Sequence, residues 1–422
     1  MSSKTNTTAA KEEAMPALVP KLRFPEFRGG DGWTEKPLKA AAHINPPNGG
    51  QPELFVYIDL ESVDAGELKA KERISRVGAP SRAQRLVERG DIIYQVVRPY
   101  QRNNLLCEFD DDENYVASTG YAQLRAKGSN RFLYQSIHTD SFVGRVIAKC
   151  TGSNYPAINS SDLADIHLPI PPTLLEQQKI AECLSSVDEL MAAQARKVDA
   201  LKTHKKGLMQ QLFPREGETH PRLRFSEFHN TGEWETRELS DFITERNEYP
   251  KEKVPLFSLT IEDGVTPKTE RYERSFLVND EADAYKLVMP DDFAFNPMNL
   301  RFGAIGRHSG IDKVAVSKYY NIFSCDKTVD SRFCEMYFRS DRMVAFYDDR
   351  AIGSLIEKRR VHFAAFLKFD IRFPRLPEQQ RIATCLTSLD ALITAETQKL
   401  EALKTHKNGL MQQLFPSPET EA

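Results

Sequence analysis

The chain contains one long segment written twice. Residues 176–214 align without a gap with residues 378–416, and 26 of the 39 positions are identical. A second repeated element precedes each copy: the run PKLRFPEF leads to Trp33, and the run PRLRFSEF leads to Trp234, 201 residues later. A period of about 200 residues is far longer than a solenoid unit, so the repeat indicates a duplicated domain with a duplicated helical block.

Each repeated block is predicted to form a long helix. Apolar residues recur at alternating steps of four and three from Ile180 to Leu212 and again from Ile382 to Leu414, with Gln194 and Lys205 as polar interruptions. This heptad pattern predicts helices about 55 to 60 Å long. An apolar seam on an otherwise polar helix needs a partner, and the other copy is the obvious one. Packing of each stripe against its own domain is the alternative.

The segments between the repeated ends predict mixed α/β domains. Short β-prone runs such as Leu54–Ile58 occur in both, and each segment closes with alternating apolar residues before a proline, at 166–171 and 369–374. The predicted order is a disordered tail (1–19), a domain (20–172), a helix (173–214), a linker (215–220), a second domain (221–375), a second helix (376–416) and a short tail (417–422).

Composition excludes several classes of protein. The 422 residues suffice for two or three domains. No apolar run is long enough for a membrane span or a signal peptide, so we expect a cytoplasmic protein. The six cysteines are scattered, which argues against a disulfide framework and a zinc site. A formal charge of −3 gives no overall attraction for nucleic acid, so phosphate contacts would need local basic patches.

No catalytic motif fits this sequence, and we expect no catalytic residue, metal or cofactor on the chain. The run Asn45-Pro46-Pro47-Asn48 is similar to the N-P-P-aromatic motif of adenine methyltransferases, but its fourth residue is not aromatic. No glycine-rich loop between strand and helix accompanies it, so a turn is the better interpretation. The glycines of residues 301–310 match neither a P-loop nor a dinucleotide-binding pattern.

Side chains suited to DNA recognition occur in basic and polar loops of the segments between the repeated ends, where the two copies differ in sequence. Arginine and lysine suit guanine edges and phosphates, asparagine suits adenine, and aromatic rings suit splayed bases. A solvated charged face is the alternative. We expect Arg301 to contact a base and Arg359 a phosphate. The candidate DNA-binding residues are Arg98, Tyr100, Arg102, Lys149, Asn154, Tyr155, Asn296, Asn299, Arg301, Arg307, Lys358, Arg359 and Arg360.

The two helical blocks also repeat polar residues that a coiled-coil seam does not need. Their identity suggests a surface used twice, by two copies of one partner, although a recent duplication would give the same pattern. The candidate partner-binding residues are Lys202, His204, Gln210, Lys404, His406 and Gln412.

The repeated motifs at the start and end of the helical blocks resemble those of a known family. The P-P-x-x-x-E-Q-Q-K-I-A run of residues 171–181, its second form at 374–383, and the repeated L-K-T-H-K-x-G-L-M-Q-Q-L-F-P are similar to the specificity subunit of type I restriction-modification systems. The resemblance extends from Pro20 to Pro416. It is specific in the helical repeats and uninformative in the divergent segments, which vary with the DNA target.

The resemblance implies a fold and a function. Two globular α/β target-recognition domains would each read one half of a bipartite DNA site, separated by two long antiparallel coiled-coil helices in a pseudo-two-fold arrangement. The chain would bind two adenine-methyltransferase (modification) subunits, which carry S-adenosylmethionine, and restriction subunits, which use ATP, would join them. Two other hypotheses remain: a fused methyltransferase, and a coiled-coil adaptor that binds proteins without sequence-specific DNA binding.

Overall fold

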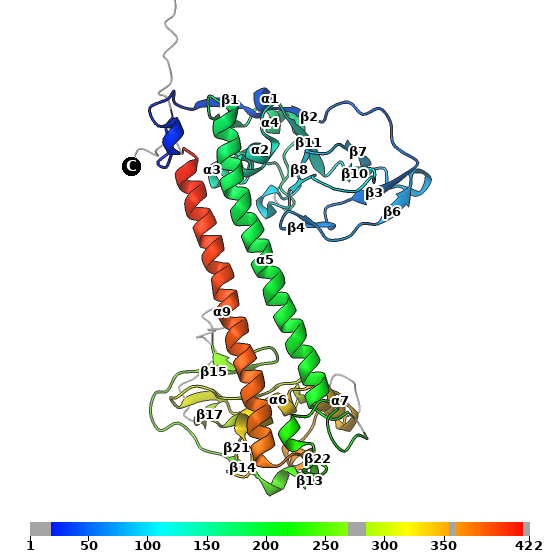
Figure 1. Ribbon diagram of the computed structural model, residues 1–422. Coiled ribbons are helices and arrows are strands. Elements are labelled where there is room, and N and C mark those ends of the chain that lie inside the picture. Colours follow the sequence, from blue (N-terminus) through cyan, green and yellow to red (C-terminus); the bar gives the residue numbers. More distant parts are fainter. Residues whose placement is uncertain (1–17, 153, 216, 269–283, 354–358, 417–422) are drawn as a thin grey trace, which may run out of the picture. The chain divides into compact units, whose positions relative to one another are not determined.

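The chain folds into two compact units. The first extends to Ala195 and includes the chain from Gln398 onward, whereas the second is continuous from Arg196 to Thr397. Both are seen in the computed structural model of Figure 1, which describes residues 18–152, 154–215, 217–268, 284–353 and 359–416.

The first unit is built around a four-stranded antiparallel sheet in the order β2-β11-β8-β9. These strands are β2 (Ala42–Ile44), β11 (Tyr121–Ala126), β8 (Ile92–Gln95) and β9 (Leu105–Leu106). Four helices accompany the sheet: α1 (Leu38–Ala41), α2 (Asn130–Ser136), α3 (Asp140–Lys149) and α4 (Ser160–Ala164). Buried apolar side chains of the sheet and of these helices, including Ile92, Leu133 and Phe142, form one core.

A second sheet of this unit has the order β6-β3-β10-β7, with β3 and β10 parallel. Its strands are β6 (Arg73–Ser75), β3 (Leu54–Ile58), β10 (Tyr115–Ser118) and β7 (Ala83–Val87), and a short hairpin joins β4 (Val63–Asp64) to β5 (Glu67–Leu68). The run Leu54–Ile58 is therefore a strand, as the sequence predicts. A two-stranded ribbon of β1 (Thr34–Pro37) and β12 (His167–Ile170) completes the unit.

The second unit repeats this plan with different residues. Its four-stranded antiparallel sheet has the order β14-β21-β18-β19, which is the order of the first unit. The strands are β14 (Ile243–Arg246), β21 (Asn321–Cys325), β18 (Phe293–Phe295) and β19 (Ile305–Arg307), with helices α6 (Ser331–Phe338), α7 (Asp341–Arg350) and α8 (Phe363–Leu367). The predicted fold class, mixed α/β domains with an internal repeat, is confirmed.

The remaining strands of the second unit also have counterparts in the first. The ribbon of β13 (Glu235–Glu238) and β22 (Asp370–Phe373) corresponds to that of β1 and β12. Two antiparallel strand pairs, β15 (Phe257–Thr260) with β16 (Gly264–Pro267) and β17 (Tyr285–Val288) with β20 (Val314–Ser317), are joined by a parallel bridge between Leu256 and Ala315. That bridge corresponds to the parallel pairing of β3 with β10.

Two helices of 39 residues carry the repeated blocks: α5 (Leu174–Leu212) and α9 (Leu376–Leu414). Within each unit they run antiparallel (Figure 1). In the first unit Lys407 Nζ lies 2.7 Å from Asp188 Oδ1, and in the second Lys205 Nζ lies 2.5 Å from Asp390 Oδ1. Each lysine and each aspartate is repeated after 202 residues, so these are two copies of one ion pair.

The predicted seam is confirmed on both sides. In the first unit Ile180 and Leu184 are buried with Leu414, and in the second Ile382 and Leu386 are buried with Leu212. Each apolar stripe therefore packs against the other copy as well as against the adjoining domain. Thr173 Oγ1 accepts a hydrogen bond from the backbone N–H of Glu176 (3.2 Å) and so caps the start of α5.

The end of each helix docks beside a tryptophan that does not belong to its own repeat. Leu22 N donates to Gln413 O (2.9 Å) near the end of α9, and Leu223 N donates to Gln211 O (3.0 Å) near the end of α5. The ring of Phe415 lies 6.0 Å from that of Trp33. The first unit is thus completed by the end of the second repeated block.

Three expectations about the termini and linker have different outcomes. Residues 1–17 and 417–422 lie outside the described residues. Leu18, at the end of the tail predicted to be disordered, forms a β-bridge with Trp33. The predicted linker is attached to the second unit, because Thr219 O accepts from Trp234 N (3.1 Å) and Glu218 O accepts from Arg372 (3.2 Å).

No described helix is long and apolar enough to cross a membrane. All six cysteines fall within the described residues, where each is a free thiol.

Candidate nucleic-acid interface

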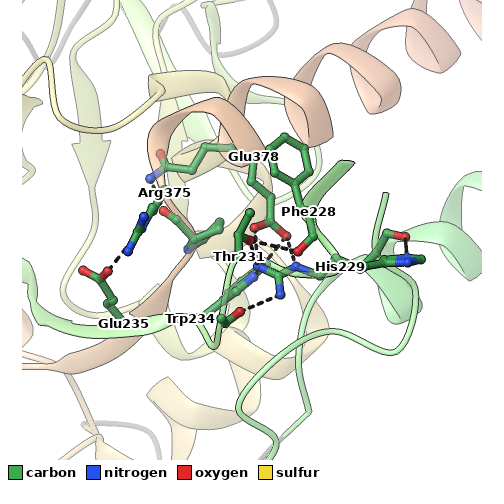
Figure 2. Close-up of polar contacts among 11 residues, drawn as sticks. Phe228, His229, Thr231, Trp234, Glu235, Arg375 and Glu378 are labelled. Atoms are coloured by element: carbon green, nitrogen blue, oxygen red, sulfur yellow. Dashed lines mark hydrogen bonds and ion pairs between the residues drawn. The ribbon is translucent and has the colours of Figure 1, made fainter. Parts of the chain in front are cut away.

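A buried polar cluster at the start of each long helix explains why the repeated ends are alike. Figure 2 shows the second copy, where Glu378 accepts two hydrogen bonds from Arg224 (2.8 and 2.7 Å) and one from Trp234 Nε1 (3.3 Å). In the first copy Glu176 accepts from Arg23 (2.7 and 2.8 Å) and from Trp33 Nε1 (3.1 Å). A buried carboxylate needs such partners, so the cluster fixes each helix to its domain.

The glutamine that follows each of these glutamates makes a second attachment. Gln177 Oε1 accepts from Ser129 N (3.1 Å), and Gln379 Oε1 accepts from Asp330 N (2.9 Å). Ser129 and Asp330 are the N-cap residues of α2 and α6. The repeated E-Q-Q run therefore positions both domains on the helices, which leaves the loops farther from the helix free to differ.

The first domain gathers its candidate residues after strand β8. The guanidinium carbon of Arg98 lies 4.4 Å from the ring centre of Tyr155, and Arg98 N donates to Pro156 O (2.7 Å). The structure thus brings together two loops that are 57 residues apart in the chain, each of which holds candidate DNA-binding residues. Tyr100 and Tyr155 are half or more exposed. Lys149 and Asn154 are exposed nearby in sequence.

Arg102 has a different environment from Arg98. Its guanidinium donates to Asp140 Oδ1 (2.6 Å) and to His138 O (3.0 Å), so it connects the loop to the start of α3. His138 beside it is neutral: burial lowers its pKa to about 4. This environment favours a structural role for Arg102, and its predicted DNA contact stays a prediction.

The candidate arginines of the second domain are held in ion pairs. Arg301 Nε lies 2.8 Å from Asp348 Oδ1, and Arg359 Nη1 lies 3.5 Å from the same atom. Arg307 contacts Asp291 (2.6 Å) and Glu335 (3.0 Å). These partners lie up to 47 residues away in the chain and were not visible from the sequence. The predicted base and phosphate contacts stay predictions, and removal of these arginines would also break internal contacts.

The remaining candidates of the second domain are more accessible or lie elsewhere. Asn299 is exposed, and Asn296 Oδ1 accepts from Met298 N (3.1 Å) within the same loop. Arg360 forms a β-bridge with Ile352. Lys358 lies outside the described residues.

A groove of about 880 Å³ in the first domain is lined by polar residues that the sequence did not single out, among them Arg82, Gln95, Gln101 and Asn103. Arg98 and Tyr155 line the same groove. The signal was present in the polar run VVRPYQRNN, where Gln101 and Asn103 alternate with the arginines. Arg82 could not be found this way, because it reaches the groove from a loop before β7.

All six candidate partner-binding residues are exposed on the long helices. Three of them line two related hollows: Lys202 and Gln210 in one of about 530 Å³ in the second unit, and Gln412 in one of about 430 Å³ in the first. Each hollow lies between the end of a long helix and the start of α7 or α3. The surface is therefore duplicated, as the repeated polar residues suggest.

Among the described residues, no group of three or more His, Cys, Asp or Glu side chains is arranged to hold a metal ion.

Comparison with known proteins identifies one domain twice in the chain. Residues 106–203 and 303–405 each match the type I restriction modification DNA specificity domain. Together the two matches cover 201 of the 422 residues, so the chain carries this domain twice. Over 287 residues it is 26% identical to the type I restriction enzyme MjaVIII specificity subunit of Methanocaldococcus jannaschii. That alignment covers 63% of this chain and 64% of the relative, slightly less than two thirds of its length.

Two solved structures have a similar fold. One, described as the structural basis underlying complex assembly and conformational transition of the type I R-M system, has a TM-score of 0.56 at 19% identity and covers 92% of this chain and 98% of that one. The type I restriction-modification system S subunit from M. genitalium has a TM-score of 0.56 at 14% identity, with 95% and 100% covered. At these identities the likeness concerns the fold.

Proposed function

We propose that the chain is the DNA-recognition subunit of a type I restriction-modification complex. Its two domains read the two halves of a bipartite double-stranded DNA target. The observation that carries the proposal is that two units with the same sheet order present different side chains at corresponding loops. After β8 the first domain has Arg98 over Tyr155, whereas after β18 the second has Asn296 and Asn299. Different readers on one framework imply an asymmetric target.

The chain also acts as a scaffold for its partners in this proposal. The duplicated hollows beside α5 and α9 support binding of two copies of one adenine-methyltransferase subunit, and restriction subunits would join through them. The chain itself is non-catalytic: S-adenosylmethionine and ATP bind to the partner subunits. The complex acts on DNA in the cytoplasm.

An exchange of one domain tests this proposal. Residues 240–375 are replaced by the equivalent segment of a relative, and methylated adenines are mapped in DNA from cells that hold the assembled complex. We expect one half of the target to change and the other half to stay. A change in both halves would contradict independent reading by two domains.

A second measurement separates this function from that of a protein-binding adaptor. The assembled complex is titrated with duplex DNA at increasing salt. A specificity subunit predicts tight binding to one sequence and an affinity that falls steeply with salt. Equal binding of the complex with and without the chain would favour the adaptor.

A further inference from the structure

The groove of the first domain is lined by apolar residues and by a set of polar side chains, several of which can donate hydrogen bonds. Arg82 and Arg98 contribute guanidinium groups, and Gln101 contributes an amide from the turn after β8. Arg82 and Gln101 are exposed. Two carboxylates, Glu61 and Asp64, line the same groove.

A chain of hydrogen bonds determines which end of the Gln101 amide faces outward. The backbone N–H of Asn103 can only donate, and it donates to Gln95 Oε1 (3.2 Å). The amide nitrogen of Gln95 must then be the donor to Gln101 Oε1 (2.9 Å). The side-chain carbonyl oxygen of Gln101 therefore accepts its hydrogen bond from Gln95. Its NH₂ group is left to donate into the groove.

Gln95 itself is held firmly enough to act as the base of this chain. It is 2% exposed at the end of β8. Its backbone N–H donates to Asn104 Oδ1 (2.8 Å). Both ends of its side chain make hydrogen bonds, so the amide cannot rotate without losing two of them.

The backbone next to Gln101 is strained in a way that positions the loop. Arg98 has φ 53° and ψ 54°, a left-handed conformation that is costly for any residue other than glycine. It is also disfavoured for a residue that precedes a proline, here Pro99. Arg102 is also left-handed, at φ 56°. The hydrogen bond from Arg98 N to Pro156 O and the stacking of its guanidinium on Tyr155 hold this conformation. Strain retained by surrounding contacts is typical of binding loops.

We propose that Arg98 and Gln101 read the major-groove edge of a guanine in the first half of the target, and that Gln95 is the residue that positions Gln101. This inference rests on the proposed DNA-recognition function. Guanine presents two neighbouring acceptors, O6 and N7, to the major groove, which match donor groups. The paired cytosine presents an N4 donor, which suits a carboxylate such as Glu61. The negative charges of Glu61 and Asp64 in the same groove would repel a phosphate, so a base edge is the better ligand.

The first test removes the readers one at a time. Complexes with Arg98→Ala, Gln101→Ala or the control Gln84→Ala are given a library of target variants, and methylation is measured for each sequence. Gln84 is an exposed glutamine of the same domain that does not line the groove. We expect both reader variants to lose about 5- to 150-fold of discrimination at the same G·C position of the first half. The control and the second half of the target should keep their preferences.

The second test inverts the amide. A carboxylate in Gln95→Glu can accept from Asn103 N but cannot donate to Gln101, so the Gln101 amide must turn and present its carbonyl oxygen. We expect preference at that position to move from guanine toward adenine or cytosine, whose amino groups lie in the major groove. A purely structural role of Gln95 would lower stability without changing this preference. An unchanged second half and normal partner binding show that the variant is folded.

Three outcomes would overturn the inference. One is an unchanged preference at every position in the reader variants. Another is weaker binding to all sequences alike with a smaller salt dependence, which would mark the groove as a phosphate site. The third is a wild-type target without a G·C pair in the first half. A wild-type complex that reads no bipartite target would instead reject the proposed function.

Discussion

At the scale of single residues, the ion pairs at the starts of the long helices are the contacts that tolerate substitution least, because both charges are nearly buried. Arg224 and Glu378 are nearly buried, at 9% and 3% exposure of their side chains. A second ion pair, Arg375 with Glu235, is also drawn in Figure 2. Arg375 Nε lies 3.5 Å from Glu235 Oε1, and both side chains are largely exposed. The two pairs therefore offer a matched comparison of a buried and a solvated contact.

We expect Arg224→Ala to lower the free energy of unfolding of the second unit by about 3 to 5 kcal/mol, because it leaves Glu378 buried without its cation. The control Arg375→Ala should cost less than about 1 kcal/mol. Urea unfolding of the full chain, followed by tryptophan fluorescence, measures both. Equal effects of the two variants would show that the buried cluster does not anchor the helix.

His138 gives the first unit a defined response to acid. Its Nδ1 donates to Tyr134 O (2.6 Å) and its Nε2 accepts from Asn104 Nδ2 (3.1 Å), a pattern that requires the neutral ring. Burial, together with the nearby Lys407 and Arg102, lowers its pKa from 6.5 to about 4. The unfolded chain therefore binds a proton at higher pH than the folded chain, and the stability conferred by neutral His138 is lost as the pH falls from 6.5 toward 4.

Between pH 7 and pH 5 this residue should lower the free energy of unfolding by about 2 kcal/mol. The variant His138→Gln removes the titrating group, so its stability should change less over the same interval. Thermal unfolding of both proteins at each pH measures the difference. Parallel pH profiles for wild type and variant would contradict this prediction.

The sequence selects candidate residues by their type, and the fold determines which of them become neighbours. Arg98 and Tyr155 were both selected for their chemistry, and the fold brings them together. Arg301 and Arg307 were selected for the same reason, but carboxylates from α7 and α6 neutralise them. A list of basic residues cannot reveal such partners, because they become neighbours only in the folded domain.

At the scale of elements, the long helices were predictable and the domain topology was not. The heptad from Ile180 to Leu212 predicts both the length of α5 and its apolar partner. The shared sheet order of the two domains leaves almost no trace in sequence, because apolar residues of many kinds satisfy a buried strand. The sequence predicts short strands such as Leu54–Ile58 in both domains, but not their order in the sheets.

We expect cysteines placed at Leu184 and Leu410 to crosslink within one chain, since both side chains contribute to one apolar cluster of the first unit. The experiment uses a chain in which Cys183 and Cys385 are replaced by alanine, and crosslinking is read from gel mobility. The pair Leu184 and Leu386 serves as the control for a parallel arrangement. Crosslinking of that pair instead would reject the antiparallel helices.

At the scale of the whole molecule, the duplication predicts how many partners bind. The two hollows use equivalent helix residues, for example Gln210 and Gln412. Light scattering of the mixed complex should therefore give two methyltransferase subunits per chain. Gln210→Glu with Lys202→Glu should reduce this number to one, and the same changes at Gln412 and Lys404 should remove the other copy. Saturation of the wild-type chain at one subunit would contradict this prediction.

The docking of Phe415 beside Trp33 sets the order in which the chain can mature on the ribosome. The second unit is continuous, so all of its parts have been synthesised once Thr397 is made. The first unit is begun earlier but needs the end of α9, which is translated after the whole of the second unit. The first unit is thus begun before the second but completed after it. Until the final turns of α9 are made, some 380 codons after Trp33, the apolar cluster around Trp33 lacks Leu414 and Phe415.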